Sequence, residues 1–300
     1  MKVTYNVGFK TNGKITGCEL DILVDAGMST DVSPVMPHNI VNGLKKYDWG
    51  ALSFDIKVCK TNNPSRSTMR APGEAQGSFI AEAIIEHVAF TLCMDVDIIR
   101  KVNLHTFNSL KKFYKNAGEP RDYTLPSIWD RLATSSCLKQ RTEMVDKFNS
   151  SNIWKKRGLS RIPIVQEMTL RPTPGKVSIL TDGSVVVEVG GIEIGQGLWT
   201  KVRQMVTYAL SSIKCDGTSD LLEKVRVVQS DTIGLIQGGG TYASTTSESS
   251  CEAVRLCCNI LVERLTALKK RLEKSGSVKW DVLISQVVVC SVSFRRTFYD

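Results

Sequence analysis

Alternating apolar and polar residues predict a β-hairpin at the start of the chain. The alternating apolar positions are Val3, Tyr5, Val7 and Phe9, followed by Leu20, Ile22 and Val24. An Asn-Gly pair at residues 12 and 13 supplies the turn, so residues 1–27 are predicted to form a hairpin. The same alternation predicts a strand over 52–59, and the Ser-, Pro-, Asn- and Gly-rich stretch before it, to about residue 50, is predicted to be a loop.

Apolar residues spaced by three and four positions predict helices further along. Ile80, Ile84 and Val88 form one such stripe, so residues 78–89 are predicted to be helical, followed by a short helix over 95–104. Residues 105–175 are polar and basic and contain five of the nine prolines. Only short helices, over 125–137 and 141–149, are predicted there, and the stretch is expected to connect two lobes.

The second half of the chain repeats the mixture of strands and helices. A hairpin is predicted over 177–189, a helix over 198–213, a strand over 225–230 and a long helix over 248–273. Thr245 and Glu248 have the spacing of a capping box at the start of the long helix. The predicted class is α+β: two mixed α/β lobes joined by a polar, proline-containing connector. The predicted domains are 1–122 and 123–300, with the boundary within 105–175.

Three glycine-rich or polar loops run directly into predicted helices. They are Met69-Arg-Ala-Pro-Gly-Glu-Ala-Gln-Gly77, Gly190-Gly-Ile-Glu-Ile-Gly-Gln-Gly197 and Gly238-Gly-Gly-Thr-Tyr-Ala-Ser-Thr-Thr-Ser-Glu248, called here the first, second and third junctions. The first turn of a helix has unpaired N–H groups that attract anions. The three junctions therefore suggest a chain that presents backbone N–H groups to one large anionic ligand.

Each junction also has a simpler interpretation. The second can be a tight β–α turn, since it lacks the third glycine of a dinucleotide loop and has no Walker lysine, although Gln196 could read a polar heterocycle edge. Arg70 can bind a phosphate or carboxylate, or bridge surface loops. Seven of the ten residues from Thr241 to Ser250 are Ser or Thr, which serves helix capping as well as phosphate binding.

Composition narrows the function classes. With 42% hydrophobic and 23% charged residues, and no apolar run near the ~18 residues of a membrane span, we expect a cytoplasmic globular protein without membrane contact. The nine cysteines form no C-x-x-C pair and are expected to be mostly buried free thiols. With three histidines and no ligand motif, a zinc or iron site made by this chain alone is not expected. The net charge of +9 is spread along the chain, so a nucleic-acid partner is not expected.

Taken together and in order, several motifs resemble the xanthine dehydrogenase/aldehyde oxidase family of molybdenum hydroxylases, and most closely its plant aldehyde oxidases. Besides the three junctions, they are Val58-Cys-Lys-Thr-Asn62, Asp146-Lys-Phe-Asn149, Trp154-Lys-Lys-Arg-Gly158, Thr181-Asp-Gly-Ser184 and Thr245-Thr-Ser-Glu-Ser-Ser-Cys-Glu-Ala-Val254. The resemblance extends to about Gln286. It implies two molybdopterin-binding domains, both incomplete relative to the family, and we expect a truncated or mispredicted gene product.

The resemblance implies a molybdenum-dependent aldehyde oxidase segment, for which aldehyde, water and O2 give carboxylic acid and hydrogen peroxide. The implied cofactor is molybdenum–molybdopterin, with [2Fe–2S] clusters and FAD in full-length relatives. The family's glutamate base has no counterpart here, because Glu74, Glu193 and Glu248 lie elsewhere, so no catalytic residue is expected. The alternative is an inactive chain that binds a cofactor or a partner. The implied partners are an aldehyde substrate and a second copy in a homodimer, or a full-length paralogue.

The resemblance also assigns site residues by position. Those implied to hold the cofactor are Arg70, Ile194, Gly195, Gln196, Ala243, Ser244, Thr246 and Ser247, with Arg70 and Ala243 nearest the molybdenum. Those implied to line the substrate pocket are His38, Pro72, Leu170 and Tyr242. His38 and Pro72 stand where purine-oxidising relatives have an arginine and a stacking phenylalanine, which points away from xanthine. Tyr242 replaces a small residue beside the metal site, and a bulky ring there could block substrate or cofactor.

Overall fold

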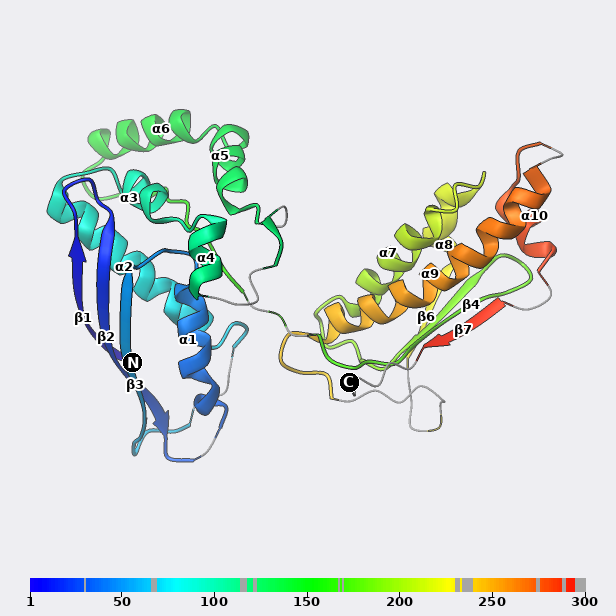
Figure 1. Cartoon of the computed structure of the whole chain (residues 1–300), viewed down its shortest axis with the longest axis horizontal. Coiled ribbons are helices and arrows are strands. Elements are labelled where there is room, and N and C mark those ends of the chain that lie inside the picture. Colours follow the sequence, from blue (N-terminus) through cyan, green and yellow to red (C-terminus); the bar gives the residue numbers. More distant parts are fainter. Residues whose placement is uncertain are drawn as a thin grey trace. The chain divides into compact units, whose positions relative to one another are not determined.

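The computed structural model describes two compact units, Met1–Glu167 and Met168–Asp300 (Figure 1). The described residues are 1–29, 31–65, 69–113, 118–120, 123–166, 168, 170–229, 233, 240–273, 276–287 and 290–294. Part of the third junction, including Gly238, and the predicted strand end Ser230 lie outside them. The boundary after residue 122 stays a prediction.

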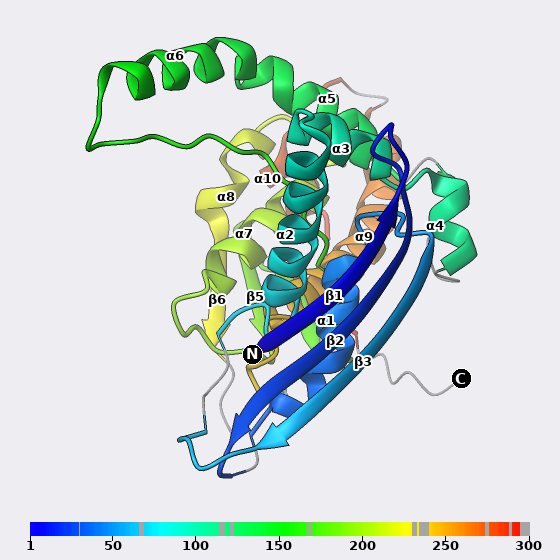
Figure 2. The ribbon, with the colours of Figure 1, turned by 90° about the vertical axis from the view of Figure 1, so that its left-hand side faces the viewer.

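The first unit is built on a three-stranded sheet in the order β1-β2-β3 (Figure 2). β1 (Lys2–Phe9) and β2 (Ile15–Gly27) are antiparallel, and β3 (Ala51–Lys60) runs parallel to β2. Along β2, Cys18, Leu20, Ile22 and Val24 are buried while the residues between them are exposed, as the alternation predicted. The predicted hairpin and the strand over 52–59 are confirmed.

The loop predicted up to residue 50 is wrong, because residues 36–44 form the helix α1 (Met36–Leu44). Pro37 stands in its first turn, where proline is compatible with a helix, and Ile40 and Leu44 lie buried on one face. α1 packs closely against α2 (Glu74–Leu92), which contains the predicted helix over 78–89. A Cβ at Gly77 would lie 2.2 Å from the Ile40 carbonyl oxygen, so the two helices need glycine at their contact.

Glu82 of α2 holds two buried cations inside the first unit. Its carboxylate lies 2.9 Å from Lys46 Nζ and accepts hydrogen bonds of 2.9 Å from Arg100 Nε and from the Tyr47 hydroxyl. Arg100 belongs to α3 (Val96–Asn103) and extends the network to Asp97 and Glu86. Burial lowers the pKa of Lys46 and raises the pKa of Tyr47. The neighbouring Glu82 carboxylate acts against the effect of burial on Lys46, because it stabilises the protonated ammonium.

The expected connector is largely part of the first unit. It contains α4 (Phe107–Phe113), which was not predicted, and α5 (Leu125–Ser135) and α6 (Leu138–Ser151), which confirm the two predicted short helices. Arg161, further along, donates to Asp97 of α3 at 2.8 Å and lies 3.9 Å from the ring of Trp129 in α5. These contacts fasten the helical stretch to α3.

The second unit has a four-stranded sheet in the order β6-β5-β4-β7. β4 (Gly175–Ile179) and β5 (Val185–Val189) form the predicted hairpin, β6 (Val225–Gln229) runs parallel to β5, and β7 (Cys290–Phe294), not predicted, pairs antiparallel with β4. The helices α7 (Leu198–Ser211) and α9 (Thr246–Leu272) pack on this sheet and on each other (Figure 1). The short helices α8 (Leu221–Lys224) and α10 (Trp280–Ser285) complete the unit. Both units are thus α+β.

The cysteines of the described chain are divided between buried and exposed positions. None of the eight cysteines whose side chains the structure describes forms a disulfide. Cys18, Cys215, Cys257 and Cys258 are buried, whereas Cys93 and Cys137 are exposed. Burial raises the pKa of Cys18 to about 11 and that of Cys258 to about 12, so these buried thiols stay protonated at neutral pH. Among the described residues, no helix is both long enough and apolar enough to cross a membrane.

Candidate cofactor site

At the second junction, the protein's own carboxylate takes up the N–H groups at the start of α7. Glu193 Oε1 accepts hydrogen bonds from the N–H groups of Gly195 at 2.8 Å and Gly197 at 2.9 Å, and Oε2 accepts one from Trp199 at 3.3 Å. These donors, Gly197 first, lower the pKa of Glu193. The expectation that this helix start offers free N–H groups to an anionic ligand is therefore wrong here, because Glu193 already fills that place.

Gln196 is bound within the same loop. Its Oε1 accepts from the Ile194 N–H at 2.7 Å, and its Nε2 donates to the Ile192 carbonyl at 2.9 Å. Ile194 projects outward with 67% of its surface exposed. Gly195 and Gly197 have φ values of +102° and +77°, and a Cβ on either would meet no atom within 4 Å. The loop thus has a fixed shape and open space over both glycines.

The third junction is organised by Arg171, a residue that the sequence did not single out. Its Nε donates to Thr245 Oγ1 at 2.8 Å, and its Nη2 donates to the Tyr242 carbonyl at 3.0 Å and to Thr246 Oγ1 at 3.2 Å. The Arg171 backbone N–H also donates to Ser249 Oγ at 3.0 Å. The predicted capping box is wrong, because the Thr245 side chain makes no capping bond to the helix and accepts from Arg171 instead.

Two candidate residues of this junction have unusual backbone conformations. Ala243 and Ser244 have φ values of 60° and 56°, the left-handed region that favours glycine. Tyr242, just before them, places its ring 4.2 Å from the Arg171 guanidinium and keeps 62% of its surface exposed. Tyr242 is therefore held at a defined place beside the turn. Leu170, 45% exposed, directly precedes Arg171, so the structure brings Leu170 to the same turn.

The second and third junctions pack against each other within the second unit. The Ile192 N–H donates to Thr241 Oγ1 at 3.0 Å, and Lys201 Nζ of α7 lies 3.5 Å from Ser247 Oγ of α9. A Cβ at Gly191 would lie 2.6 Å from Thr246 Cγ2, so the loop approaches α9 closely. The segments that carry Ile194–Gln196 and Ala243–Ser247, which the resemblance assigns to one site, are thus in contact through Gly191, Ile192 and Lys201.

Residues of the first junction gather in the first unit. Asn39 of α1 donates to the Pro72 carbonyl at 2.6 Å, and His38, its neighbour, makes a 3.0 Å hydrogen bond to Asn42. Arg70 is exposed beside them. The start of α2 is closed by Gln76, whose Oε1 accepts from the Gly73 N–H at 2.7 Å. His38, Arg70 and Pro72 therefore lie around the contact of α1 with the loop before α2.

The paired junctions of the second unit present polar groups suited to a heteroatom-rich cofactor such as molybdopterin. Thr246, Ser247, Ser249 and Ser250 line up buried hydroxyls along the first turns of α9. Ser250 Oγ has no hydrogen-bond partner in the described part of the chain, and a buried hydroxyl without a partner is costly. Open space over Gly195 and Gly197 lets a ligand approach the loop backbone. Hydroxyls, an amide and free backbone space match a ligand rich in heteroatoms.

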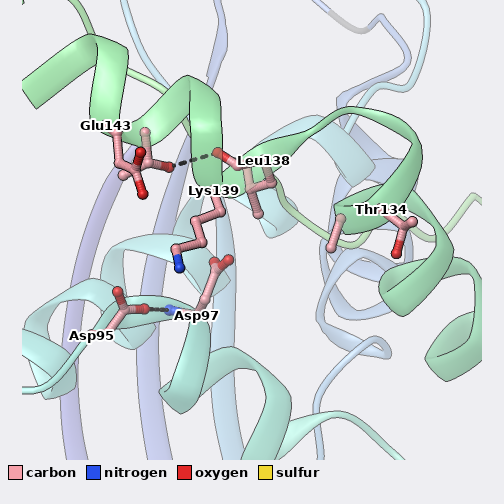
Figure 3. Close-up of a pocket in the computed structure, with 8 residues that line it drawn as sticks. Asp95, Asp97, Thr134, Leu138, Lys139 and Glu143 are labelled. Carbon is pink, nitrogen blue, oxygen red and sulfur yellow. Dashed lines mark hydrogen bonds between the residues drawn. The ribbon is translucent and has the colours of Figure 1, made fainter.

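A separate pocket of about 460 Å³ lies between α3 and the helices α5 and α6 (Figure 3). Asp95, Asp97, Lys139 and Glu143 line it, and none of the candidate site residues does. Asp95 accepts from the Asp97 N–H at 2.7 Å and caps α3, while Asp97 binds Arg100. The carboxylates of Asp95 and Asp97 are thus engaged in contacts that stabilise α3.

Comparison with known proteins identifies the family. Two family models, both described as molybdopterin cofactor-binding domain, match residues 1–104 and 131–297. The chain is 65% identical to an abscisic-aldehyde oxidase of Arabidopsis thaliana over 95% of its own length, and 58% identical to an indole-3-acetaldehyde oxidase of Arabidopsis thaliana over 99%. It spans 22% of the length of each relative.

Solved structures share the fold at low sequence identity. The aldehyde oxidoreductase from Desulfovibrio desulfuricans matches 97% of this chain and 31% of its own with a TM-score of 0.64 and 18% identity. The quinoline 2-oxidoreductase from Pseudomonas putida 86 matches 97% and 42% with a TM-score of 0.67 and 15% identity. The chain belongs to the xanthine dehydrogenase/aldehyde oxidase family and contains sequence from its molybdopterin cofactor-binding domains.

Proposed function

We propose that the protein acts in a molybdenum-dependent aldehyde oxidase, with the paired second and third junctions as a wall of the molybdopterin site. The reaction is aldehyde plus water and O2 to carboxylic acid and hydrogen peroxide. The proposal is supported by the hydrogen bonds Ile192–Thr241 and Lys201–Ser247, which join the segment carrying Gln196 to the segment carrying Ala243, Ser244, Thr246 and Ser247. It is also supported by the match of the chain to molybdopterin cofactor-binding domains.

The residues of the second unit have separable roles in this proposal. Gln196 exchanges its bonds to Ile194 and Ile192 for bonds to the cofactor, since its amide both donates and accepts. The hydroxyls of Thr246 and Ser247 donate to polar cofactor atoms, and the turn at Ala243 brings backbone close to the ligand. When bound, the cofactor supplies the redox and oxygen-transfer chemistry.

Arg70 and the substrate-pocket residues complete the proposal. Arg70 offers an exposed guanidinium, which suits an oxyanion or a carboxylate. His38 and Pro72 do not supply the cation and the stacking ring that a purine would use, so we propose an aldehyde substrate. Within the second unit, Leu170 and the Tyr242 ring add apolar surface at the third junction, and both are more than 40% exposed.

Cofactor binding without turnover is the second candidate. It is favoured by Glu193, the carboxylate in the cofactor loop, which is fully engaged by backbone N–H groups and therefore is not poised as a base. In that case the chain holds the cofactor or binds a full-length paralogue. A homodimer is the proposed assembly. We also propose a reducing compartment such as the cytoplasm, since none of the cysteines whose side chains are described forms a disulfide.

Metal and pterin analysis of the purified chain tests both candidates. The chain is expressed in a host that makes molybdopterin, and molybdenum is measured by mass spectrometry and pterin by the fluorescence of its oxidised form. We expect Gln196→Ala and Arg70→Ala to retain less of both, while Gln140→Ala and Arg264→Ala, at exposed positions elsewhere, behave as the wild type.

Three outcomes separate the alternatives. Retained molybdenum with aldehyde-dependent O2 consumption supports the oxidase. Retained molybdenum without O2 consumption supports cofactor binding alone. A chain that holds no molybdenum in a host that loads a full-length relative overturns both, and equal retention in all four variants overturns the assignment of Arg70 and Gln196.

A further inference from the structure

The Arg171 side chain donates hydrogen bonds to three residues of the third junction, Tyr242, Thr245 and Thr246. The guanidinium reaches the Tyr242 carbonyl, the Thr245 hydroxyl and the Thr246 hydroxyl with three hydrogen bonds of 2.8–3.2 Å. Its own backbone N–H is tied to Ser249 in the first turn of α9 at 3.0 Å. Hydrogen bonds from a charged donor are stronger than neutral ones, so one side chain holds the entry of α9 on both sides of the Ala243–Ser244 turn.

The turn that Arg171 encloses needs such support. Ala243 and Ser244 both have left-handed φ values without being glycine, and each such residue costs free energy that the surroundings must offset. Arg171 binds the residue immediately before this pair and the residue immediately after it. A turn fixed at both ends keeps its strained residues in one conformation.

The Tyr242 ring is fixed by the same guanidinium. Arg171 Cζ lies 4.2 Å from the ring centroid, a geometry in which a cation is attracted to the ring face. A Cβ at Gly240 would lie 2.9 Å from Tyr242 Cδ1, so a glycine is needed beside the ring. The ring therefore lies against the Arg171 guanidinium and close to the Gly240 backbone, with most of its surface exposed.

We propose that Arg171 is a positioning residue that fixes the Tyr242–Thr246 turn, and with it the Tyr242 ring, as a rigid wall of the molybdopterin site. The cofactor part of this inference rests on the proposed function, whereas the fixing of the turn does not. Lysine cannot replace Arg171, because a single ammonium cannot reach three acceptors in the arrangement of the planar guanidinium fork.

Hydrogen exchange in the full chain tests the fixing of the turn. We expect Arg171→Met and Arg171→Lys to speed the exchange of the Ser249 and Ser250 amides about ten- to a hundredfold. Each charge-assisted hydrogen bond that is lost raises the equilibrium constant for local opening by about a factor of ten. Amides of β4 and β5 should keep their rates. Arg255→Met is the matched control, because Arg255 of α9 makes a bidentate pair with Glu252 but does not touch the turn. Unchanged exchange at the start of α9 overturns the proposal.

Pterin release tests the cofactor part and separates it from a general loss of stability. The holo chain of each variant is diluted and pterin loss is followed by fluorescence, alongside thermal unfolding. We expect faster release from Arg171→Met, Arg171→Lys and Tyr242→Leu at an unchanged unfolding temperature, with Tyr242→Phe restoring wild-type release because it keeps the ring.

The two readouts keep the failures apart. Faster exchange with wild-type pterin release refutes the cofactor role of Arg171 but leaves the proposed function intact. A wild-type chain that binds no molybdopterin removes the proposed function and the cofactor role together, and the exchange data then decide the fixing of the turn alone. Equal effects of Arg171→Met and Arg255→Met overturn the assignment to Arg171.

Discussion

Replacing Glu82 by glutamine removes the carboxylate that two buried cations share. Lys46 and Arg100 have side chains that are 0% and 1% exposed, and both lie 2.9 Å from Glu82. Breaking a buried ion pair by removing one partner costs about 3–5 kcal/mol, because the remaining charge has lost its compensation. The amide oxygen of glutamine still accepts a hydrogen bond from the Tyr47 hydroxyl, so the loss of stability comes from the broken ion pairs with Lys46 and Arg100. We therefore expect Glu82→Gln to lower the free energy of unfolding of the first unit by about 3–5 kcal/mol.

Glu86→Gln provides an internal control for the charge argument. Glu86 lies one turn further along α2 and binds the same Arg100 at 3.1 Å, but its side chain is 61% exposed. An exposed pair is worth at most about 1 kcal/mol.

The two variants are compared by hydrogen exchange of the slowest amides in β2 and α2. At about 1.4 kcal/mol per factor of ten, Glu82→Gln should speed them roughly a hundredfold to several thousandfold, and Glu86→Gln less than about tenfold. Equal rates in both variants would refute the reasoning from burial.

Three further predictions concern the helix contact and two titrating groups. Gly77→Ala should destabilise the chain by about 1–3 kcal/mol in urea unfolding, despite the better helix propensity of alanine, because its Cβ meets the Ile40 carbonyl; Gly158→Ala, with nothing within 4 Å, should change little. Burial lowers the pKa of His105 below 6.5, so stability falls as the pH drops below 6.5, and His105→Gln should flatten that slope in urea midpoints measured against pH. The pKa of Glu193 lies below 4.5, so protection of the Gly197 amide should be lost on acidification through that lower pKa, and Glu193→Gln should abolish this dependence.

Local patterns predicted the strands β1 to β6 and most helices but missed β7 and α1, and the miss of α1 has its cause in close packing. The hairpins followed from alternation and an Asn-Gly or Asp-Gly turn, both of which are local signals. α1 was missed because Pro37, Asn42 and Gly43 are typical of loops. In the structure Gly43 allows α1 to approach α2, since a Cβ there would lie 2.7 Å from the Glu74 carbonyl oxygen. That requirement is tertiary and leaves no periodic trace in the sequence.

The candidate site was predictable as a set of loops but not as a set of contacts. The motifs singled out Gln196 and the Ala243–Ser247 stretch, and in the structure the segments that carry them are joined by the Ile192–Thr241 and Lys201–Ser247 hydrogen bonds. Their role in cofactor binding stays a prediction. Arg171 lies 71 residues from Tyr242 and its role depends on folding, so spacing cannot reveal it. Glu193 was considered only as a base. Its place just before a helix start, where carboxylates favour the unpaired N–H groups, was the signal for its actual contacts.

The closure of the α7 start by Glu193 affects how ligands of this protein should be sought. A sulfate or phosphate ion would have to displace a carboxylate that is covalently tethered to the same loop, and a tethered competitor acts at a high effective concentration. Thermal-shift or crystallisation screens with inorganic anions are therefore blind to this loop. Screening with intact pterins avoids that competition. Their heterocycle can replace the Ile194 N–H and the Ile192 carbonyl as hydrogen-bond partners of the Gln196 amide, while Glu193 stays in place.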